Sequence, residues 1–179
     1  NWTVVKVTAV FDIRRTNKKF FLFDKTLKEV YRTYTIIEEI KDEDGFPCDN
    51  LSEIINWVRN TLQQFLRHEK FKIQAVNFSG YGASMVHVDK HGMPVAPLYS
   101  YLKPYPPEML TEFYDEYGDQ WKLAKETCSP PLDMLNSGLQ LYWLKYAKPE
   151  VFKKIKWSLH FPQYLSYLFK VAFFYAKSA

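Results

Sequence analysis

The sequence predicts an α/β fold with a mixed sheet, in which strands dominate the first half of the chain and helices dominate the second. Three β-forming runs joined by short polar turns open the chain, and an amphipathic helical pattern and further strand and helix patterns follow them. The 179 residues are 47% hydrophobic, which suffices for a domain with a substantial core. We therefore expect the order β-β-β-α-β-β and then helices, in a single domain over residues 1–179.

Strand signals are strongest in the first half. β-Branched and aromatic residues crowd its first runs, and residues 38–49 are expected to form a charged loop. A helix is expected over residues 51–66, because Asn50 and Glu53 are spaced as in a capping box and apolar side chains then recur on one face. A tight turn is expected from Asp89 to Gly92. The expected strands cover residues 5–13, 19–24, 29–37, 73–78 (a buried strand) and 84–88.

The second half carries helical signals separated by prolines. Pro107 suits the first turn of a helix, and Gly118 suits its end. Trp143 and Tyr164 are interpreted as core residues rather than ligand contacts. The expected helices cover residues 107–117, 135–146, 149–155 and 161–169, with a loop at residues 119–131 and a brief strand at residues 157–159.

Composition argues against several classes of function. The net charge of +4 is modest and no basic cluster is interleaved with aromatic residues, so we expect no nucleic-acid partner. No apolar run reaches transmembrane length and no signal peptide precedes the first strand, so we expect no membrane partner and a cytoplasmic location. Cys48 and Cys128 lack metal-binding spacing and are expected to be reduced thiols, and the four histidines show no metal-ligand pattern.

The polar tip of the first predicted hairpin, within residues 7–24, is a candidate site. Asp12 closes the first strand, and residues 14–19 (Arg-Arg-Thr-Asn-Lys-Lys) connect it to the second. The carboxylate could hold Mg²⁺ or its waters, and a hydroxyl and backbone amides could face phosphate oxygens. The hairpin taken alone favours the simpler interpretation of a solvated turn.

Several motifs in the right order resemble the FGGY carbohydrate kinase family. The hairpin is similar to the family's opening Asp-x-Gly-Thr-Thr-Ser, flanked by two strands, and residues 79–82 (Ser-Gly-Tyr-Gly) resemble its Ser-Gly-Gln-x-x-Gly. Residues 86–94, 141–150 and 159–168 resemble three further segments of the family. The hairpin matches are Asp12, Thr16, Lys19 and Asp24. The motifs span nearly the whole chain, which makes the resemblance specific.

The resemblance implies a ribonuclease-H-like (actin-like ATPase) fold and an ATP-dependent carbohydrate kinase, which transfers the γ-phosphate to a sugar hydroxyl. The implied cofactors are ATP and Mg²⁺, and the implied partners are a small-molecule sugar and a nucleotide. Residues 79–82 are expected to turn after a strand, where free amides and two glycines allow a polyol to approach closely. The implied phosphate and Mg²⁺ residues are Asp12, Arg15, Thr16, Asn17 and Lys19, with Asp12 as the metal residue, and the implied sugar-binding residues are Ser79, Gly80, Tyr81, Gly82 and Tyr101.

The sequence departs from the family in three places. Arg14 replaces a glycine, and its side chain either blocks phosphate or supplies a charge-assisted contact to it. Residues 100–103 lack the Asp and Arg of the family's Trp-x-Asp-x-Arg, and residues 169–175 are apolar where the family has Thr-Gly. The family's second actin-like domain, which supplies the catalytic base, is absent from the chain. The chain is therefore expected to be the substrate-side domain, with no catalytic base and no activity alone.

Two other interpretations stay open. The chain is either a non-catalytic sugar- or partner-binding domain that kept the fold, or another actin-like protein, such as an acetate-kinase-like or hexokinase-like one. The spacing of residues 79–82 and 143–149 argues against the second. The surface that the absent domain leaves bare could drive either homodimerisation or aggregation.

Overall fold

The computed structural model describes the backbone of residues 3–176 and the side chains up to residue 170. The chain forms two compact units. Within the described range, the first unit consists of residues 3–40, 49–81 and 161–176, and the second consists of residues 41–48 and 82–160. Each unit has its own core, and each is described by itself below.

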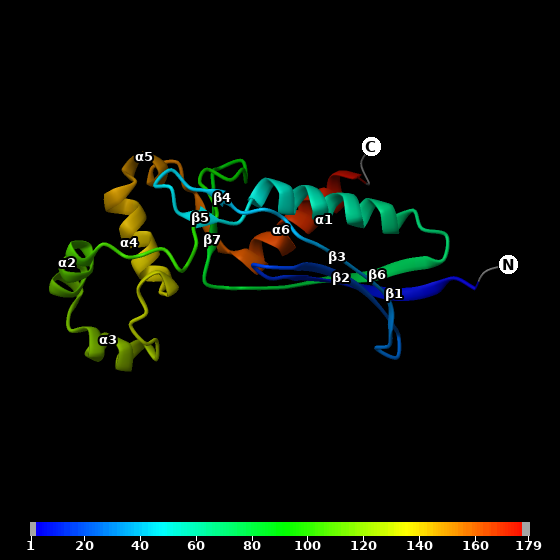
Figure 1. Cartoon of the computed structure of the whole chain (residues 1–179), viewed down its shortest axis with the longest axis horizontal. Coiled ribbons are helices and arrows are strands. Elements are labelled where there is room, and N and C mark those ends of the chain that lie inside the picture. Colours follow the sequence, from blue (N-terminus) through cyan, green and yellow to red (C-terminus); the bar gives the residue numbers. More distant parts are fainter. Residues whose placement is uncertain (1–2, 177–179) are drawn as a thin grey trace. The chain divides into compact units, whose positions relative to one another are not determined.

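The first unit is built on a four-stranded mixed sheet with strand order β3-β2-β1-β6. Strand β1 runs antiparallel to β2 and parallel to β6, and β2 runs antiparallel to β3. The parallel neighbours β1 and β6 need a crossover connection, and helix α1 lies in that connection directly before β6. The predicted α/β class with a mixed sheet is confirmed (Figure 1). The elements are β1 (Val5–Ile13), β2 (Lys18–Asp24), β3 (Glu29–Thr35), α1 (Leu51–Leu66), β6 (Phe71–Gly80) and α6 (Phe161–Ala176).

Aromatic rings fill the space between this sheet and its helices. The odd-numbered residues of β1 from 7 to 13 are buried, as strand alternation requires. The ring of Phe11 stacks on Phe78 with centroids 5.3 Å apart and meets the edge of Trp57 from α1 at 5.4 Å. Phe78 in turn contacts Phe169 of α6 at 6.3 Å. The odd-numbered face of β1 is therefore the helix-covered face of the sheet.

The predicted start of α1 is confirmed. The Asn50 side chain accepts a hydrogen bond from the Glu53 amide at 3.2 Å, which satisfies one of the unpaired amides at the helix start. The residues of α1 that are buried recur at helical spacing, because they form the stripe that faces the sheet. They are Leu51, Ile54, Val58, Thr61, Leu62 and Phe65.

The second unit combines two small strand pairs with helices. Its aromatic and aliphatic core includes Tyr99, Tyr105, Met134, Leu139 and Trp143. The pairs are β4 (Ile40–Lys41) with β5 (Pro47–Cys48), and β7 (Met85–Val88) with antiparallel β8 (Trp157–His160). The helices are α2 (Pro107–Tyr117), α3 (Gln120–Thr127), α4 (Ser137–Ala147) and α5 (Pro149–Phe152), with a 3₁₀ turn at Asp133–Leu135.

Three sequence-based expectations were wrong. Residues 119–131 are not all loop, because α3 forms there and Asp119 caps it by accepting from the Trp121 and Lys122 amides. Residues 38–49 contain two short strands rather than a loop alone. Strand β6 is longer than expected and mostly exposed or half-buried, since it borders the sheet and pairs on one side with β1.

Several turn and core interpretations are confirmed. The Asp89 carboxylate accepts hydrogen bonds from the His91 and Met93 amides, and Gly92 has a φ of 78°, as a tight turn requires. Trp143 and Tyr164 are 4% and 2% exposed and belong to the cores of their units. Among residues 3–176, no helix is long and apolar enough to cross a membrane.

Candidate functional site

A row of polar side chains crosses the sheet of the first unit near the end of β1. Asp12 lies opposite Lys19 of β2 and beside Ser79 of β6, and Lys19 lies opposite Tyr34 of β3. Directly paired residues of neighbouring strands lie on the same face of a sheet. Because the odd-numbered residues of β1 face the helices, this row lies on the opposite face. The sheet therefore brings the residues Asp12, Lys19 and Ser79, which lie on three separate strands, into one row.

Arg14 forms an ion pair with Asp12. Its Nε lies 3.1 Å from Asp12 Oδ2, and the Arg14 side chain is 71% exposed. An ion pair this exposed is weak, typically below about 1 kcal/mol. The backbone of Arg14 is ordinary, because the described non-glycine residues with positive φ are Leu27, Cys128 and Asp133. The hairpin in this chain therefore closes without the left-handed residue for which a glycine would be needed.

The tip of the hairpin is held by a backbone hydrogen bond and by an ion pair of Arg15. The Arg14 amide donates to the Asn17 carbonyl at 3.1 Å. Arg15 Nη2 lies 2.6 Å from Glu39 Oε1. Arg15, Thr16 and Asn17 line an open hollow of about 790 Å³ together with residues 36–39. Of the expected phosphate residues, Arg15 thus already has a carboxylate partner, while Thr16 is exposed at the tip.

Lys18 is a buried charged residue that the sequence analysis missed. Its side chain is fully buried, and its Nζ lies 2.8 Å from Asp49 Oδ1 and 2.7 Å from the Arg15 carbonyl. The signal that could have found it is the alternation of β2, because Lys18 is in phase with the buried Phe20 and Leu22. The neighbouring Lys19, which matches the expected motif, is only half-buried and lies in the polar row.

The expected sugar segment, residues 79–82, is not a simple turn. Ser79 and Gly80 are the last residues of β6 and pair with β1, so the strand extends further into this segment than expected. A Cβ at Gly80 would lie 3.3 Å from the Ile13 carbonyl oxygen, so this glycine allows close packing of two strands. The Tyr81 hydroxyl donates a hydrogen bond to Asp49 Oδ2. Gly82, in the second unit, has open space around its Cα.

A comparison with family profiles finds a match over nearly the whole chain. The profile described as FGGY family of carbohydrate kinases, N-terminal domain, matches residues 7–175, which span nearly the whole chain and parts of both units. The chain belongs to the FGGY family of carbohydrate kinases. No curated protein sequence matches it.

Solved structures of FGGY-like kinases share the fold. A carbohydrate kinase from Novosphingobium aromaticivorans is 22% identical with a TM-score of 0.78, over 93% of this chain and 34% of that one. A xylulose kinase from Rhodospirillum rubrum is 15% identical with a TM-score of 0.76, over 89% and 33%. Plasmodium falciparum glycerol kinase with ADP is 19% identical with a TM-score of 0.65, over 86% and 31%. The chain thus spans about a third of the length of these kinases.

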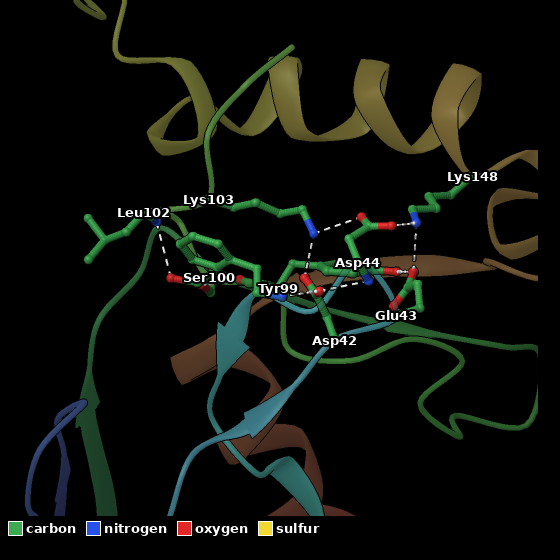
Figure 2. A network of polar contacts seen from close by, with 10 residues as sticks. Asp42, Glu43, Asp44, Tyr99, Ser100, Leu102, Lys103 and Lys148 are labelled. Carbon is green, nitrogen blue, oxygen red and sulfur yellow. Dashed lines mark hydrogen bonds and ion pairs between the residues drawn. The ribbon is translucent and has the colours of Figure 1, made fainter.

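Residues 100–103, which include the expected sugar residue Tyr101, lack the Asp and Arg of the family motif. Tyr101 is half-buried and belongs to the second unit. Two residues later, Lys103 points into the unit, where its Nζ lies 2.5 Å from Asp42 Oδ2 and 2.8 Å from Asp44 Oδ2 (Figure 2). Lys103 is 8% exposed. It pairs with two carboxylates of the β4–β5 hairpin, of which Asp42 is buried and Asp44 is 41% exposed.

The same network fixes the rest of this loop. The Tyr99 hydroxyl donates a hydrogen bond to Glu43. Burial is the main cause that raises the pKa of Tyr99 above its ordinary value, and the hydrogen bond to Glu43 is the second. Hydrogen bonds from Lys103 and Lys148 hold the pKa of the Asp44 carboxyl below its ordinary value. Figure 2 shows these side chains converging from the β4–β5 hairpin, the 99–103 loop and the end of α4.

The residues present fit a magnesium ion only in part. Within the described part of the chain, no three His, Cys, Asp or Glu side chains gather as a complete metal site would need. Mg²⁺ commonly takes one or two carboxylates from a protein and the rest of its ligands from phosphates and water. Asp12 supplies one such carboxylate, at a position that its Arg14 partner partly occupies.

Proposed function

We propose that this chain is the substrate-side domain of an ATP-dependent carbohydrate kinase, which transfers the γ-phosphate of ATP to a sugar hydroxyl. The observation that carries the proposal is the row formed by Asp12, Lys19 and Ser79 at the ends of adjacent strands. Ligands of open sheets bind beyond such strand ends. A cation beside a carboxylate and a hydroxyl suits a phosphate and a polyol that meet at one place.

In this proposal the expected residues take separate roles. Asp12 would hold Mg²⁺ that enters with the nucleotide, and the cation would neutralise charge on the transferred group. Thr16, Asn17 and Lys19 would line the phosphate path, with Arg15 less available because Glu39 holds it. In the first unit, the sugar would lie against Ser79, Gly80 and Tyr81; the other two expected sugar residues, Gly82 and Tyr101, belong to the second unit.

Activity of the complete natural protein tests this proposal. An ADP-release assay over a panel of ketoses and polyols should show sugar-dependent turnover with Mg-ATP. Asp12→Asn and Ser79→Ala should each reduce it at least about tenfold, because positioned charges and hydrogen bonds carry most of phosphoryl transfer. Asp115→Asn, an exposed carboxylate on α2, serves as the matched control. A panel without any turnover would reject the proposal.

A second function is favoured by the Arg14–Asp12 pair. With the carboxylate engaged by a guanidinium, the chain could be a non-catalytic sugar- or partner-binding domain that kept the fold. Calorimetry of Mg-ATP binding to the Arg14→Gly variant distinguishes two roles of Arg14, blocking the phosphate or contacting it. Tighter binding than in the unmodified protein indicates that Arg14 blocks the phosphate, and weaker binding indicates that its guanidinium contacts phosphate.

The domain assignment is part of the same proposal. Residues 1–179 would form a single N-terminal kinase domain in a cytoplasmic protein, and the catalytic base would come from outside these residues. The 179-residue chain alone should therefore show no sugar-dependent ADP release. Turnover well above the enzyme-free control would contradict this assignment.

A further inference from the structure

We infer that Asp49 is a positioning residue that couples the hairpin tip to the end of β6, an inference that rests on the proposed function for its meaning in catalysis. Asp49 lies directly before the N-cap of α1 and is 5% exposed. Its contacts go to Lys18 and Tyr81, each next to one of the two segments.

The two carboxylate oxygens serve different segments. Oδ1 accepts from Lys18 Nζ at 2.8 Å, and that same ammonium donates to the Arg15 carbonyl at 2.7 Å. The ammonium thereby ties the backbone of the tip to the carboxylate. Oδ2 accepts from the Tyr81 hydroxyl, which ties the residue after β6 to the same group. A displacement of the carboxylate would therefore move both segments of the proposed site together.

The contacts of Asp49 with Lys18 and Tyr81 are protected from water by burial. The side chains of Lys18 and Asp49 are 0% and 4% exposed, so water cannot replace either partner at low cost. The Tyr81 ring also packs on Phe161 of α6, with centroids 5.0 Å apart. The Asp49 carboxylate stands at the N-terminus of a 16-residue helix, where the helix dipole stabilises negative charge.

The coupling has a chemical consequence for the transfer reaction. Phosphoryl transfer depends on holding the phosphate side and the acceptor side in line. The tip offers the expected phosphate contacts, and the end of β6 offers the expected sugar contacts. A single buried carboxylate that sets the position of both would fix their relative geometry without touching either substrate.

Steady-state kinetics of the complete natural protein test the inference. Asp49→Asn should raise the KM for both sugar and ATP and lower kcat/KM by up to about 100-fold, the effect of misplacing reacting groups by about 1 Å. Tyr81→Phe should raise the KM for sugar alone. The control Tyr105→Phe loses a buried hydrogen bond to the Leu139 carbonyl in the second unit and should change neither KM. A role in stability alone would reduce the active fraction and leave both KM values unchanged, which would overturn the inference.

Hydrogen exchange decides the inference even if the unmodified protein proves inactive and the proposed function fails. In Asp49→Asn, peptides that cover residues 12–18 and 78–82 should exchange faster by a similar factor, relative to an internal reference at residues 20–35. Tyr81→Phe should accelerate exchange at residues 78–82 only. Acceleration in just one of the two segments of Asp49→Asn, or none in either, would show that the carboxylate does not couple them.

Discussion

Lys18 in the first unit and Lys103 in the second are both buried cations, yet they are neutralised in different ways. Lys18 is fully enclosed and faces one carboxylate, that of Asp49. Lys103 faces two carboxylates of the β4–β5 hairpin. Its Nζ also lies 5.6 Å and 5.3 Å from the ring centroids of Tyr99 and Trp143, within cation–π range.

The difference teaches how each unit would tolerate the loss of its cation. Without Lys18, the Asp49 charge would remain buried, and among the described residues the Tyr81 hydroxyl would be its remaining side-chain partner. Without Lys103, Asp44 would keep Lys148, 2.5 Å away, and its side chain is 41% exposed to water. The buried charge of Asp49 is therefore balanced by one ion pair, whereas several ion pairs share the charges of the second unit's network.

The largest expected effect is that of Lys18→Met. Removing one partner of a buried ion pair leaves an uncompensated charge and should lower the free energy of unfolding by about 4 kcal/mol. Urea unfolding measures it. Lys19→Met is the matched control on the same strand, and it should change stability by less than about 1 kcal/mol because Lys19 is half-buried and has solvent access. Equal stability of Lys18→Met and the unmodified chain would remove the contrast between the two networks.

The second-largest expected effect is that acid should destabilise the second unit more than the first. Burial lowers the pKa of His87 in the second unit from 6.5 to about 4, so the folded state binds fewer protons than the unfolded state. The free energy of unfolding is therefore unaffected by His87 above pH 6.5. It falls as the pH drops from 6.5 towards 4, by about 3 kcal/mol in total. His68, the histidine of the first unit, is exposed. The second unit should therefore lose protection first in hydrogen exchange between pH 6.5 and 4.

A variant controls this pH prediction. His87 Nδ1 lies 2.8 Å from Ser158 Oγ, and a glutamine at position 87 offers a polar group that does not titrate in this range. In His87→Gln, the two units should respond to acid more alike than in the unmodified chain. Unchanged acid sensitivity of the second unit would assign the effect to its carboxylates instead.

The two networks also show what the sequence could predict and what it could not. Lys18 was accessible to prediction, because its place in the alternation of β2 marks it as buried. The Lys103 contacts join residues about 60 positions apart through side chains on loops, and no local period encodes such a contact. Helix α3 was missed for a related reason, since it buries no side chain and so carries no clear apolar stripe.

The polar row at the end of β1 also combines features that local sequence patterns predict with features that only the tertiary structure sets. The strands could be predicted from residue patterns, and the predicted family is confirmed by the profile over residues 7–175. That Asp12 stands beside Ser79 depends on the register of two parallel strands, which includes a shift between Val7 and Thr8. Likewise, the tight approach of Gly80 to the Ile13 carbonyl depends on tertiary packing, whereas the sequence predicted a turn that a polyol could approach closely.

Lys103→Met should have a smaller effect than Lys18→Met. Asp42 would lose its ammonium partner but keep hydrogen bonds from the Asp44 and Phe46 amides at 3.0 Å and 2.9 Å. We expect a loss of about 2 kcal/mol, the typical penalty for a buried group that loses one partner. Urea unfolding, followed by exchange of the second unit, measures it. A loss equal to that of Lys18→Met would show that sharing the charge brings no tolerance.

Lys148→Met should have the smallest effect and sharpen the comparison most. Lys148 Nζ lies 2.5 Å from Asp44 and 3.4 Å from Glu43, but both acidic side chains are about 40% exposed. Water can solvate these carboxylates when the lysine is removed, so the expected loss is below about 1 kcal/mol. High salt should reduce this loss further, because the Debye length falls to about 3 Å at 1 M. The effect of Lys18→Met should stay nearly constant with salt, since that pair is closed to solvent. Equal salt dependence of the two variants would mean that water reaches Lys18, and the distinction between a single enclosed pair and a shared, half-open network would fail.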